Sequence, residues 1–383
     1  MVDQKAIDEL VEWMGEGAPP LADGRSIVEE ICKRLLAAGV PIEQFRLFLF
    51  TIHPLIKGRR LQWAKGKEVI STAAPRELFG TDQYLKSSLP VVIETRKSLR
   101  RRLVDPDCPD DFNIVAELRA DGFTDYLAQP VIYIDGEVHT MSWTTRHPRG
   151  FSDDEIATLE RIRAPLSRLV ESYVLRVNAA NIISTYVGRN AGDHVLKGHV
   201  ARGDSEEIEA AILFADLKNY THYSNTHPVD DVMARLNRFY DAFETPIVEQ
   251  GGEILKFMGD GLLAIFPVKP AGRKPAVGPQ DVVRAASLAV EKARAALGSE
   301  EIGFRTALHF GRLHYGNIGG SRRLDFTAIG PAVNLCARLL SAAASIGQDH
   351  VASKDAAGYL SGKRQEVAKL KLKGFSEETP VFA

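Results

Sequence analysis

The stretches EAAILFADLKNYT at residues 209–221 and EILKFMGDGLLAIF at residues 253–266 decide the fold of the C-terminal half of this chain. Each contains apolar runs of strand length, and each carries one aspartate where such a run ends, Asp216 in the first and Asp260 in the second. Asp260 lies in the segment MGDG, which is typical of a tight turn between two strands. The sequence therefore predicts two acidic side chains at strand ends.

The elements around these stretches follow a β-α-β-β-α-β order. The predicted elements are, in sequence, a strand at 209–217, a helix at 228–250, strands at 253–258 and 262–266, a helix at 279–297 and a strand at 303–310. This order is typical of a ferredoxin-like α+β domain, an antiparallel sheet with helices on one face. We expect the strands at 209–216 and 253–258 to pair, so that Asp216 and Asp260 converge on one point.

Two converging carboxylates form a candidate metal site. Mg²⁺ and Mn²⁺ prefer such hard oxygen ligands and keep positions free for phosphate oxygens. Two ions held in this way can activate a 3′-hydroxyl and stabilise a leaving pyrophosphate. Taken alone, however, an aspartate at a strand end is more often a cap or a turn residue, so the wider pattern has to decide.

That wider pattern consists of five motifs in a fixed order. They are FADLKNYT (214–221), KFMGDGLLAIF (256–266), ALHFGRLHYGNIG (307–319), RLDFTAIGPAVNLCARL (323–339) and LKLKGF (370–375). Together they resemble the successive signatures of class III adenylyl and guanylyl cyclases, from about residue 205 to the end. The resemblance implies that residues 209–383 form a catalytic domain that converts ATP to 3′,5′-cyclic AMP and pyrophosphate, with two Mg²⁺ or Mn²⁺ ions per active site.

The resemblance also implies roles for single residues. Asp216 and Asp260 would hold the two metal ions, helped by the backbone carbonyl of Leu217. Lys256 and Thr327 occupy the two positions that read the purine. A lysine only donates hydrogen bonds, which suits N1 of adenine and clashes with the protonated N1 of guanine. ATP is therefore favoured.

Purine selection is nevertheless left partly open. Guanylyl cyclases place glutamate and typically cysteine at these two positions. Thr327 resembles the class IIIb subgroup, but its hydroxyl both donates and accepts. A guanylate cyclase, or a cyclase of relaxed specificity, stays an alternative.

Further positions correspond to residues that contact ribose and phosphates. Asn334 and Arg338 are four residues apart in a segment that reads as a helix, so they share one face. By resemblance, Asn334 orients the ribose and Arg338 stabilises the charge that grows on the α-phosphate. Arg322 and Lys373 align with positions that bind the β- and γ-phosphates.

In the family, one subunit supplies the metal ligands of an active site and its partner supplies the residues that read the base and stabilise the transition state. A monomer would then hold half of each site, so a two-fold homodimer with two equivalent sites is implied. All the required parts occur in this one chain, which favours a homodimer over unlike subunits.

The N-terminal part has a different pattern. Residues 1–175 contain a helix, β-rich runs, a hairpin signal at Asp135-Gly136 and a long amphipathic helix that Ser152 caps. This order resembles an α+β GAF-type sensor domain, which would respond to a small-molecule or protein signal that the sequence does not identify. Residues 176–208 read as short helical pieces broken by glycines, and we expect them to form a connector.

The composition limits the classes of protein to which this chain can belong. The 383 residues carry 48 Lys+Arg and 50 Asp+Glu, and this near balance predicts no general attraction to nucleic acid. No apolar stretch has the roughly 18 residues needed to cross a bilayer, and the first residues lack a signal-peptide core. We expect a cytoplasmic protein with no membrane span. Three scattered cysteines predict free thiols rather than a disulfide framework.

Two alternative functions have less support in the sequence. Gly251-Gly252-Glu253 resembles a diguanylate cyclase signature, but Ile254 and Leu255 follow it, so we interpret the glycines as a helix C-cap and turn. A non-catalytic cyclase-like binding module would ordinarily lack a metal aspartate, Asn334 or Arg338, and all are present. The sequence leaves open the choice between Mg²⁺ and Mn²⁺, bicarbonate sensitivity and the direction of any regulation.

Overall fold

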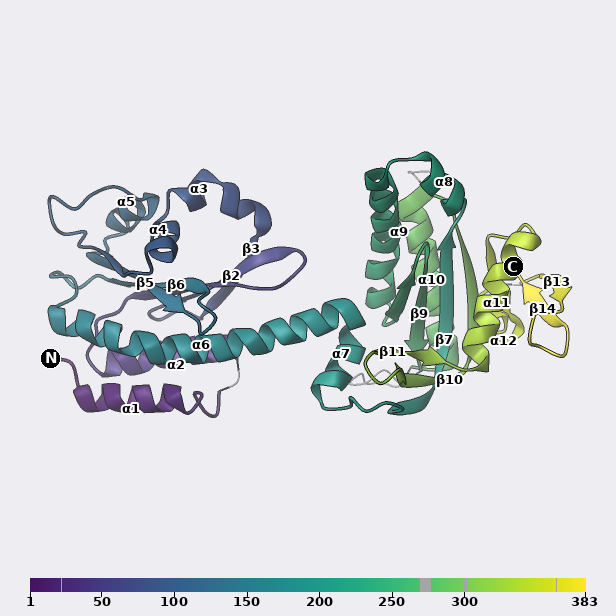
Figure 1. Cartoon of the computed structure of the whole chain (residues 1–383), viewed down its shortest axis with the longest axis horizontal. Helices are drawn as coiled ribbons and strands as arrows, with labels where there is room; N and C mark the ends of the chain where they lie inside the picture. The colour runs from purple at the N-terminus through teal and green to yellow at the C-terminus, as the bar shows by residue number, and fades with distance from the viewer. Residues whose placement is uncertain (22, 269–276, 299–301, 363) are drawn as a thin grey trace. The chain divides into compact units, whose positions relative to one another are not determined.

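The computed structural model of this chain describes residues 1–21, 23–268, 277–298, 302–362 and 364–383. The chain divides into two compact units, Met1–Ile182 and Ile183–Ala383 (Figure 1). Each unit has its own buried core. No helix in the described residues combines the length and the hydropathy needed to cross a bilayer.

The N-terminal unit is built on a six-stranded antiparallel sheet in the order β3-β2-β1-β6-β5-β4. Its strands are β1 (Gln44–Phe50), β2 (Ile56–Ala64), β3 (Ile70–Pro75), β4 (Leu99–Arg101), β5 (Asp125–Ile132) and β6 (Val138–Thr145). Its helices are α1 (Gln4–Gly15), α2 (Gly24–Ala37), η1 (Arg76–Gly80), α3 (Asp82–Leu85), α4 (Ser88–Thr95), α5 (Asn113–Ala120) and α6 (Asp153–Val187). The predicted α+β class is confirmed, and the GAF-type resemblance stays a prediction.

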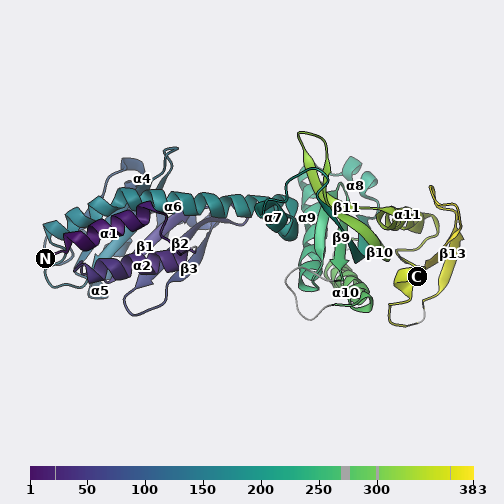
Figure 2. The same ribbon diagram turned by 90° about the horizontal axis from the view of Figure 1, so that it is seen from below.

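Both faces of this sheet are covered. Because side chains alternate along a strand, Phe45, Leu47 and Leu49 of β1 point to one face, where they join a core with α1, α2 and α6. Arg46 and Phe48 point to the other face, on which the short helices α3, α4 and α5 lie (Figure 1). Figure 2 shows the first face, with α1, α2 and α6 toward the viewer. A second, smaller core lies under these short helices.

The predicted hairpin and the predicted Ser152 N-cap are confirmed. Strands β5 and β6 pair from Ile132 opposite Val138, and Gly136 in their turn has a φ of +88°. The backbone N–H of Ser152 donates to Glu155 Oε2, and the N–H of Glu155 donates to Ser152 Oγ.

Helix α6 runs on through the predicted start of the connector. The predicted helix break at Gly188 is confirmed, but residues 176–187 continue α6 and are not a separate short piece, and the predicted break at Gly192 is wrong because this residue lies within a helix. Helix α6 continues this far because residues 176–187 contain no glycine or proline. A short helix, α7 (Arg189–Leu196), follows.

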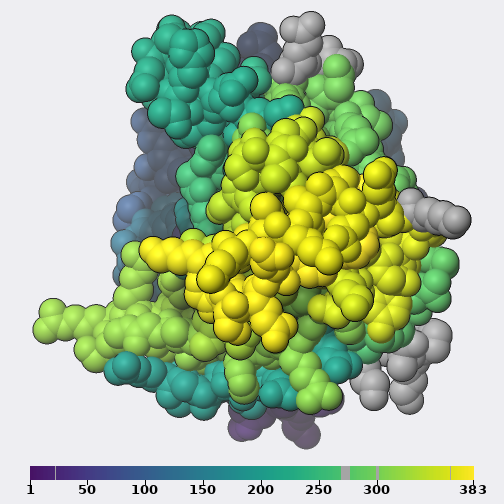
Figure 3. Space-filling view, turned by 90° about the vertical axis from the view of Figure 1, so that its right-hand side faces the viewer, coloured from purple at the N-terminus to yellow at the C-terminus, as the bar shows by residue number. Residues whose placement is uncertain are grey.

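The C-terminal unit has an eight-stranded sheet. Along it the order is β13-β14-β12-β10-β7-β9-β8, and β11 pairs with β10. The strands are β7 (Ser205–Leu217), β8 (Glu253–Met258), β9 (Gly261–Pro267), β10 (Phe304–Gly319), β11 (Leu324–Ile329), β12 (His350–Ser353), β13 (Glu366–Leu370) and β14 (Thr379–Phe382). The helices are α8 (Tyr220–Thr226), α9 (Val229–Glu249), α10 (Pro279–Gly298), α11 (Pro331–Ser345) and α12 (Lys354–Ala357). Figure 3 views the side on which the last strands, in yellow, lie.

The segment β7-α9-β8-β9-α10-β10 has the predicted ferredoxin-like order, and its four strands lie side by side as β10-β7-β9-β8. Helices α9 and α10 pack on one face of this sheet, and α11 packs on the other. Gly251 follows α9 with a φ of +80°, as expected for a helix C-cap glycine.

The predicted pairing of strands 209–216 and 253–258 is wrong. Strand β9 lies between them and pairs antiparallel with both β7 and β8. The tight turn between β8 and β9 makes those two strands neighbours, and the longer α9 connection then places β9 beside β7.

Candidate active site

The two aspartates meet because of how β9 pairs with β7. In this ladder Asp216 lies opposite Gly261, the first residue of β9. The backbone N–H of Leu217 donates to the carbonyl oxygen of Asp260 at 2.9 Å. A backbone hydrogen bond therefore joins the end of β7, at the residue after Asp216, to the β8–β9 turn at Asp260.

Two glycines allow this close approach. Gly259 has a φ of +64°, in the left-handed region, and its carbonyl accepts a hydrogen bond from the Tyr240 hydroxyl of α9. A Cβ on Gly261 would lie 2.7 Å from the carbonyl oxygen of Ala215. The glycines on both sides of Asp260 are thus required by backbone shape and by space.

Asp216 is electrostatically unsatisfied. Its Oδ1 atom is buried and has no hydrogen-bond partner in the described residues. The pKa of Asp216 is raised to about 6, mainly by burial and also by the charge of Asp260, while the positive charge of Arg305 opposes this rise. A bound cation would offset the free-energy cost of burying this carboxylate, because it gives the carboxylate oxygen a partner.

The donor set at this point suits a hard divalent cation. It offers carboxylate oxygens from Asp216 and Asp260 and backbone carbonyl oxygens beside them. Within the described residues, no group of three or more His, Cys, Asp and Glu side chains gathers at one point. Further ligands would have to be carbonyls, water or phosphate oxygens, which is how Mg²⁺ is commonly bound.

The two positions predicted to read the base belong to a second group of residues. The ammonium of Lys256, on β8, donates to Asp325 Oδ2 of β11 at 2.6 Å. This hydrogen bond lowers the pKa of Asp325 below its usual value. Thr327 lies two residues after Asp325, so it is on the same face of β11.

Asp325 is absent from the sequence-based set of site residues. The motif RLDFTAIG contains Asp325 two positions before Thr327. Because side chains alternate along a strand, this spacing puts both side chains on one face. The pairing with Lys256 could not be foreseen, because it depends on how β11 lies against β8.

Asn334 and Arg338 both lie on helix α11. Pro331 is its first residue, and its missing N–H is one that a first turn leaves unpaired in any case. Both side chains are exposed, and they are one helical turn apart. Within the described residues neither side chain has a hydrogen-bond or ion-pair partner, so both are free to meet a ligand.

Arg322 and Lys373 are exposed and lie in connecting segments. Arg322 lines a cavity of 460 Å³ together with Arg323 and Asp325. Lys373 follows β13 in a turn. No hydrogen bond or ion pair among the described residues joins either of them to Asp216 or Asp260.

The family of this unit follows from its sequence. Residues 204–379 match the family model described as the adenylate and guanylate cyclase catalytic domain. This segment of the chain belongs to the class III cyclase family. The matched segment contains every predicted site residue, including both aspartates of the pair.

Individual relatives of this cyclase domain cover part of the chain. An uncharacterized protein of Mycobacterium tuberculosis is 28% identical over 205 residues, which are 54% of this chain and 37% of that protein. Adenylate cyclase 1 of Rhizobium meliloti is 30% identical over 149 residues, 37% of this chain and 22% of that protein. The chain thus spans well under two thirds of the length of these curated relatives. The crystal structure of the adenylyl cyclase CyaB from P. aeruginosa has a TM-score of 0.40 and 21% identity, and covers 47% of this chain and 94% of that one.

Proposed function

We propose that this chain is an adenylate cyclase that converts ATP to 3′,5′-cyclic AMP and pyrophosphate at two sites shared between two copies of the chain. The observation that carries the proposal is the hydrogen-bonded pair formed by the end of β7 and the β8–β9 turn, which brings Asp216 and Asp260 together. The family of residues 204–379 supports it, because its members are adenylate and guanylate cyclases.

In this proposal Asp216, Asp260 and the carbonyl of Leu217 hold two Mg²⁺ or Mn²⁺ ions. When bound, such ions lower the pKa of the 3′-hydroxyl and neutralise charge on the triphosphate. The 3′-hydroxyl would lose its proton to water, its oxygen would form a bond to the α-phosphorus, and the bond from that phosphorus to the bridging oxygen would break, so that pyrophosphate leaves with that electron pair. The unpaired Oδ1 of Asp216 fits this role, since a buried carboxylate oxygen without a partner favours a cation.

Lys256 and Thr327 would read the adenine. The Lys256 ammonium donates to N1, and the Thr327 hydroxyl accepts from the 6-amino group. Asp325 would position the lysine, because its carboxylate holds the ammonium at 2.6 Å. A lysine ammonium can only donate hydrogen bonds.

The free side chains of α11 would act on the sugar and the α-phosphate. Asn334 would orient the ribose so that its 3′-hydroxyl faces the α-phosphorus. Arg338 would donate to the oxygens on which charge grows as the new bond forms. Arg322 and Lys373 would bind the β- and γ-phosphates, and both are exposed as that role requires.

Two copies of the chain are part of the proposal. Within one chain these contacts form two separate groups. One is the acid pair at the end of β7 and in the β8–β9 turn, and the other is the Lys256–Asp325 pair on β8 and β11. The free residues of α11 contact neither group through a hydrogen bond or ion pair in the described residues. A second copy related by a two-fold axis would bring complementary groups together twice.

The test of the reaction is incubation of the purified chain with ATP or GTP and Mg²⁺ or Mn²⁺, followed by chromatography of the products. Cyclic AMP from ATP, at a rate that exceeds cyclic GMP from GTP, is the expected result. Absence of any cyclic nucleotide under all four conditions would leave a non-catalytic nucleotide-binding module as the better interpretation.

The shared site has its own test. Asp216→Ala and Arg338→Ala should each abolish activity, and mixing the two inactive proteins should restore it, because a mixed dimer keeps one intact site. The proposal of a shared site fails if mixed dimers form and stay inactive.

A guanylate cyclase, or one of relaxed specificity, is the second candidate. Thr327 favours it, since a hydroxyl can donate to the 6-oxo group of guanine as well as accept. The ratio of cyclic AMP to cyclic GMP formed in competition between ATP and GTP separates the two candidates.

We further propose that residues 1–175 regulate the cyclase, that residues 176–208 connect the two, and that the chain works in the cytoplasm, where ATP is available. A signal in the N-terminal unit would shift the pairing of two catalytic domains and so open or close both sites together. If removal of residues 1–175 changes neither the cyclase rate nor dimerisation, this part of the proposal is wrong.

A further inference from the structure

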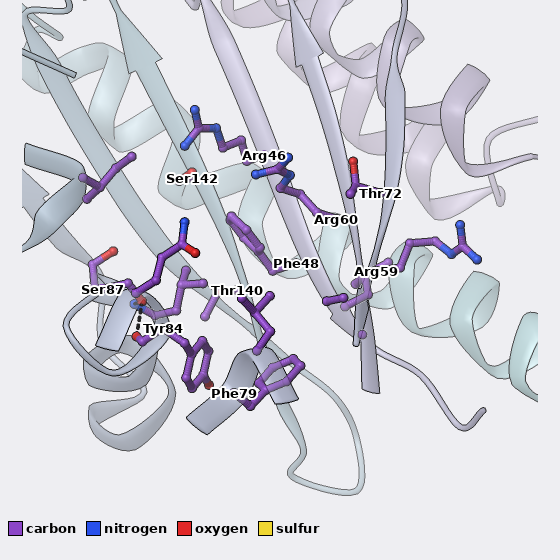
Figure 4. Close-up of a pocket in the computed structure, with 18 of the residues that line it drawn as sticks. Arg46, Phe48, Arg59, Arg60, Thr72, Phe79, Tyr84, Ser87, Thr140 and Ser142 are labelled. Atoms are coloured by element: carbon purple, nitrogen blue, oxygen red, sulfur yellow. Dashed lines mark hydrogen bonds between the residues drawn. The ribbon is translucent and has the colours of Figure 1, made fainter. Parts of the chain in front are cut away.

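The N-terminal unit contains a cavity of 310 Å³ between its sheet and the short helices on the Arg46 face (Figure 4). Its lining comes from β1, β2, β3, β5 and β6 on the sheet side and from η1, α3, α4 and α5 on the other side. This volume falls in the range of small-molecule pockets.

Two arginines lie at one end of this cavity. Arg46 is on β1 and Arg60 is on β2, and strand pairing sets Arg60 opposite Phe48 on the same face of the sheet as Arg46. Figure 4 shows the two guanidinium groups near each other, with Thr72 and Ser142 beside them.

Among the residues that the structure describes, neither arginine has a hydrogen-bond or ion-pair partner. The Nε atoms of Arg46 and Arg60 are buried without a hydrogen bond, and neither guanidinium forms an ion pair in the described residues. Glu117 of α5 also lines the cavity, and it makes no ion pair with either arginine. Burial lowers the pKa of Arg46 and the positive charge of Arg60 lowers it further, while the nearby charges of Glu117 and Asp121 partly oppose this shift.

This arrangement costs free energy when the cavity holds water alone, because two like charges lie together in a partly buried place. An anion bound between the two guanidinium groups would satisfy both at once. Planar guanidinium groups match carboxylate and phosphate oxygens in particular.

The opposite end of the cavity is aromatic. Phe79 of η1 contacts Tyr84 of α3 with ring centroids 4.8 Å apart, and it contacts Phe50 at 5.6 Å. Phe48 lies between this end and the arginines (Figure 4). The cavity thus has one cationic end and one apolar end.

From this polarity we infer that the cavity binds a small organic anion, with its carboxylate or phosphate group at Arg46 and Arg60 and its apolar body against Phe48 and Phe79. The site lies within the N-terminal unit and does not depend on the proposed cyclase activity.

Thermal unfolding of the full chain tests this site, with tryptophan fluorescence as the readout. All three tryptophans, Trp13, Trp63 and Trp143, belong to the N-terminal unit, so the signal reports this unit alone. The probes are benzoate, phenyl phosphate and inorganic phosphate at constant ionic strength, with benzamide as a neutral molecule of the same shape.

The expected result is that benzoate or phenyl phosphate at saturation raises the unfolding midpoint by roughly 3 °C or more, and that benzamide does not. A larger shift with benzoate identifies a carboxylate ligand, and a larger shift with phenyl phosphate identifies a phosphate ester. Inorganic phosphate should shift the midpoint less than phenyl phosphate, since it leaves the aromatic end empty.

Arg46→Met and Arg60→Met should each abolish the shift. Arg25→Met is the matched control, because Arg25 is an exposed arginine of α2 in the same unit and does not line the cavity. It should respond to the anions as the wild type does. Without ligand, Arg60→Met should unfold at the wild-type temperature or above, because the substitution removes one of two unpaired like charges.

Three results would overturn the inference. They are no shift with any of the three anions, an equal shift with benzamide, or a shift that survives both Arg46→Met and Arg60→Met. A ligand-free Arg60→Met variant that unfolds well below the wild type would also count against it, since Arg60 would then have a structural partner.

Discussion

The backbone N–H of Leu217 donates to the carbonyl oxygen of Asp260 at 2.9 Å, and this bond joins the end of β7 to the β8–β9 turn. Its consequence is that Asp216 and Asp260 come together through backbone pairing alone, before any metal binds. The two acids are therefore preorganised, and the geometry of the turn is open to test.

Gly261→Ala should reduce cyclase activity by about 10-fold or more while the chain still folds. A Cβ at this position would lie 2.7 Å from the carbonyl oxygen of Ala215 and 3.5 Å from Asp216 Cβ, so β9 must move away from β7 beside the acid pair. Product chromatography measures the rate, and circular dichroism checks the fold. Gly298→Ala is the control, since a Cβ there meets nothing within 4 Å. Full activity in the Gly261 variant would contradict the role of this close approach.

Asp216→Asn should weaken Mn²⁺ binding by about 10-fold or more, because it removes a ligand charge from a buried oxygen that has no other partner. The loss of the free Mn²⁺ signal in electron paramagnetic resonance measures binding directly, without substrate. Asp349→Asn is a suitable control, since Asp349 already pairs with Lys218 at 2.7 Å. Equal Mn²⁺ affinity in both variants would show that Asp216 is not a metal ligand.

Acid should destabilise the N-terminal unit through His139. Burial lowers the pKa of His139 to about 4, and its Nδ1 accepts a hydrogen bond from the Phe50 N–H at 2.8 Å. The unfolded chain therefore binds the proton first, so this contribution to stability is complete above about pH 6.5 and is lost as the pH falls toward about 4. At pH 5 the loss is about 2 kcal/mol.

The measurement is the difference in unfolding midpoint between pH 7 and pH 5, read by tryptophan fluorescence. His139→Asn should reduce this difference, since the amide oxygen can still accept from Phe50 and the side chain does not titrate. His147→Gln, at an exposed position of the same unit, should keep the wild-type difference. An unchanged difference in the His139 variant would assign the acid sensitivity to another group.

The sequence predicted the order of elements in the C-terminal unit because local patterns determine that order. The apolar run before Asp216, the MGDG turn at Asp260 and Pro331 at the start of α11 each mark their element directly. It did not predict the correct strand neighbour of β7, because either strand of the β8–β9 hairpin has the apolar pattern needed to pair. The acids converge in either case. Asp260 lies in the turn between β8 and β9, so it is at the end of whichever of these two strands pairs with β7.

Contacts between residues that are far apart in the chain could not be predicted from the sequence. The Lys256–Asp325 ion pair joins residues 69 positions apart, and no local pattern signals it. The arginine pair of the N-terminal cavity is similar, because Arg46 and Arg60 become neighbours only through the register of β1 and β2. In both places the sequence shows the residue types, and the fold decides which of them become neighbours.

A change of base preference should require three substitutions rather than two. Lys256→Glu with Thr327→Cys introduces the pair that guanylyl cyclases carry, but the new carboxylate would meet Asp325, which now holds the lysine at 2.6 Å. Adding Asp325→Asn removes this repulsion. The triple variant should lower the ratio of kcat/KM for ATP to that for GTP by about 100-fold, because a hydrogen-bonding site strongly rejects a mismatched edge. Rates of cyclic AMP and cyclic GMP formation measure the ratio. The double variant with Asp325 intact should be the less active of the two, and an unchanged ratio in the triple variant would show that these positions do not read the base.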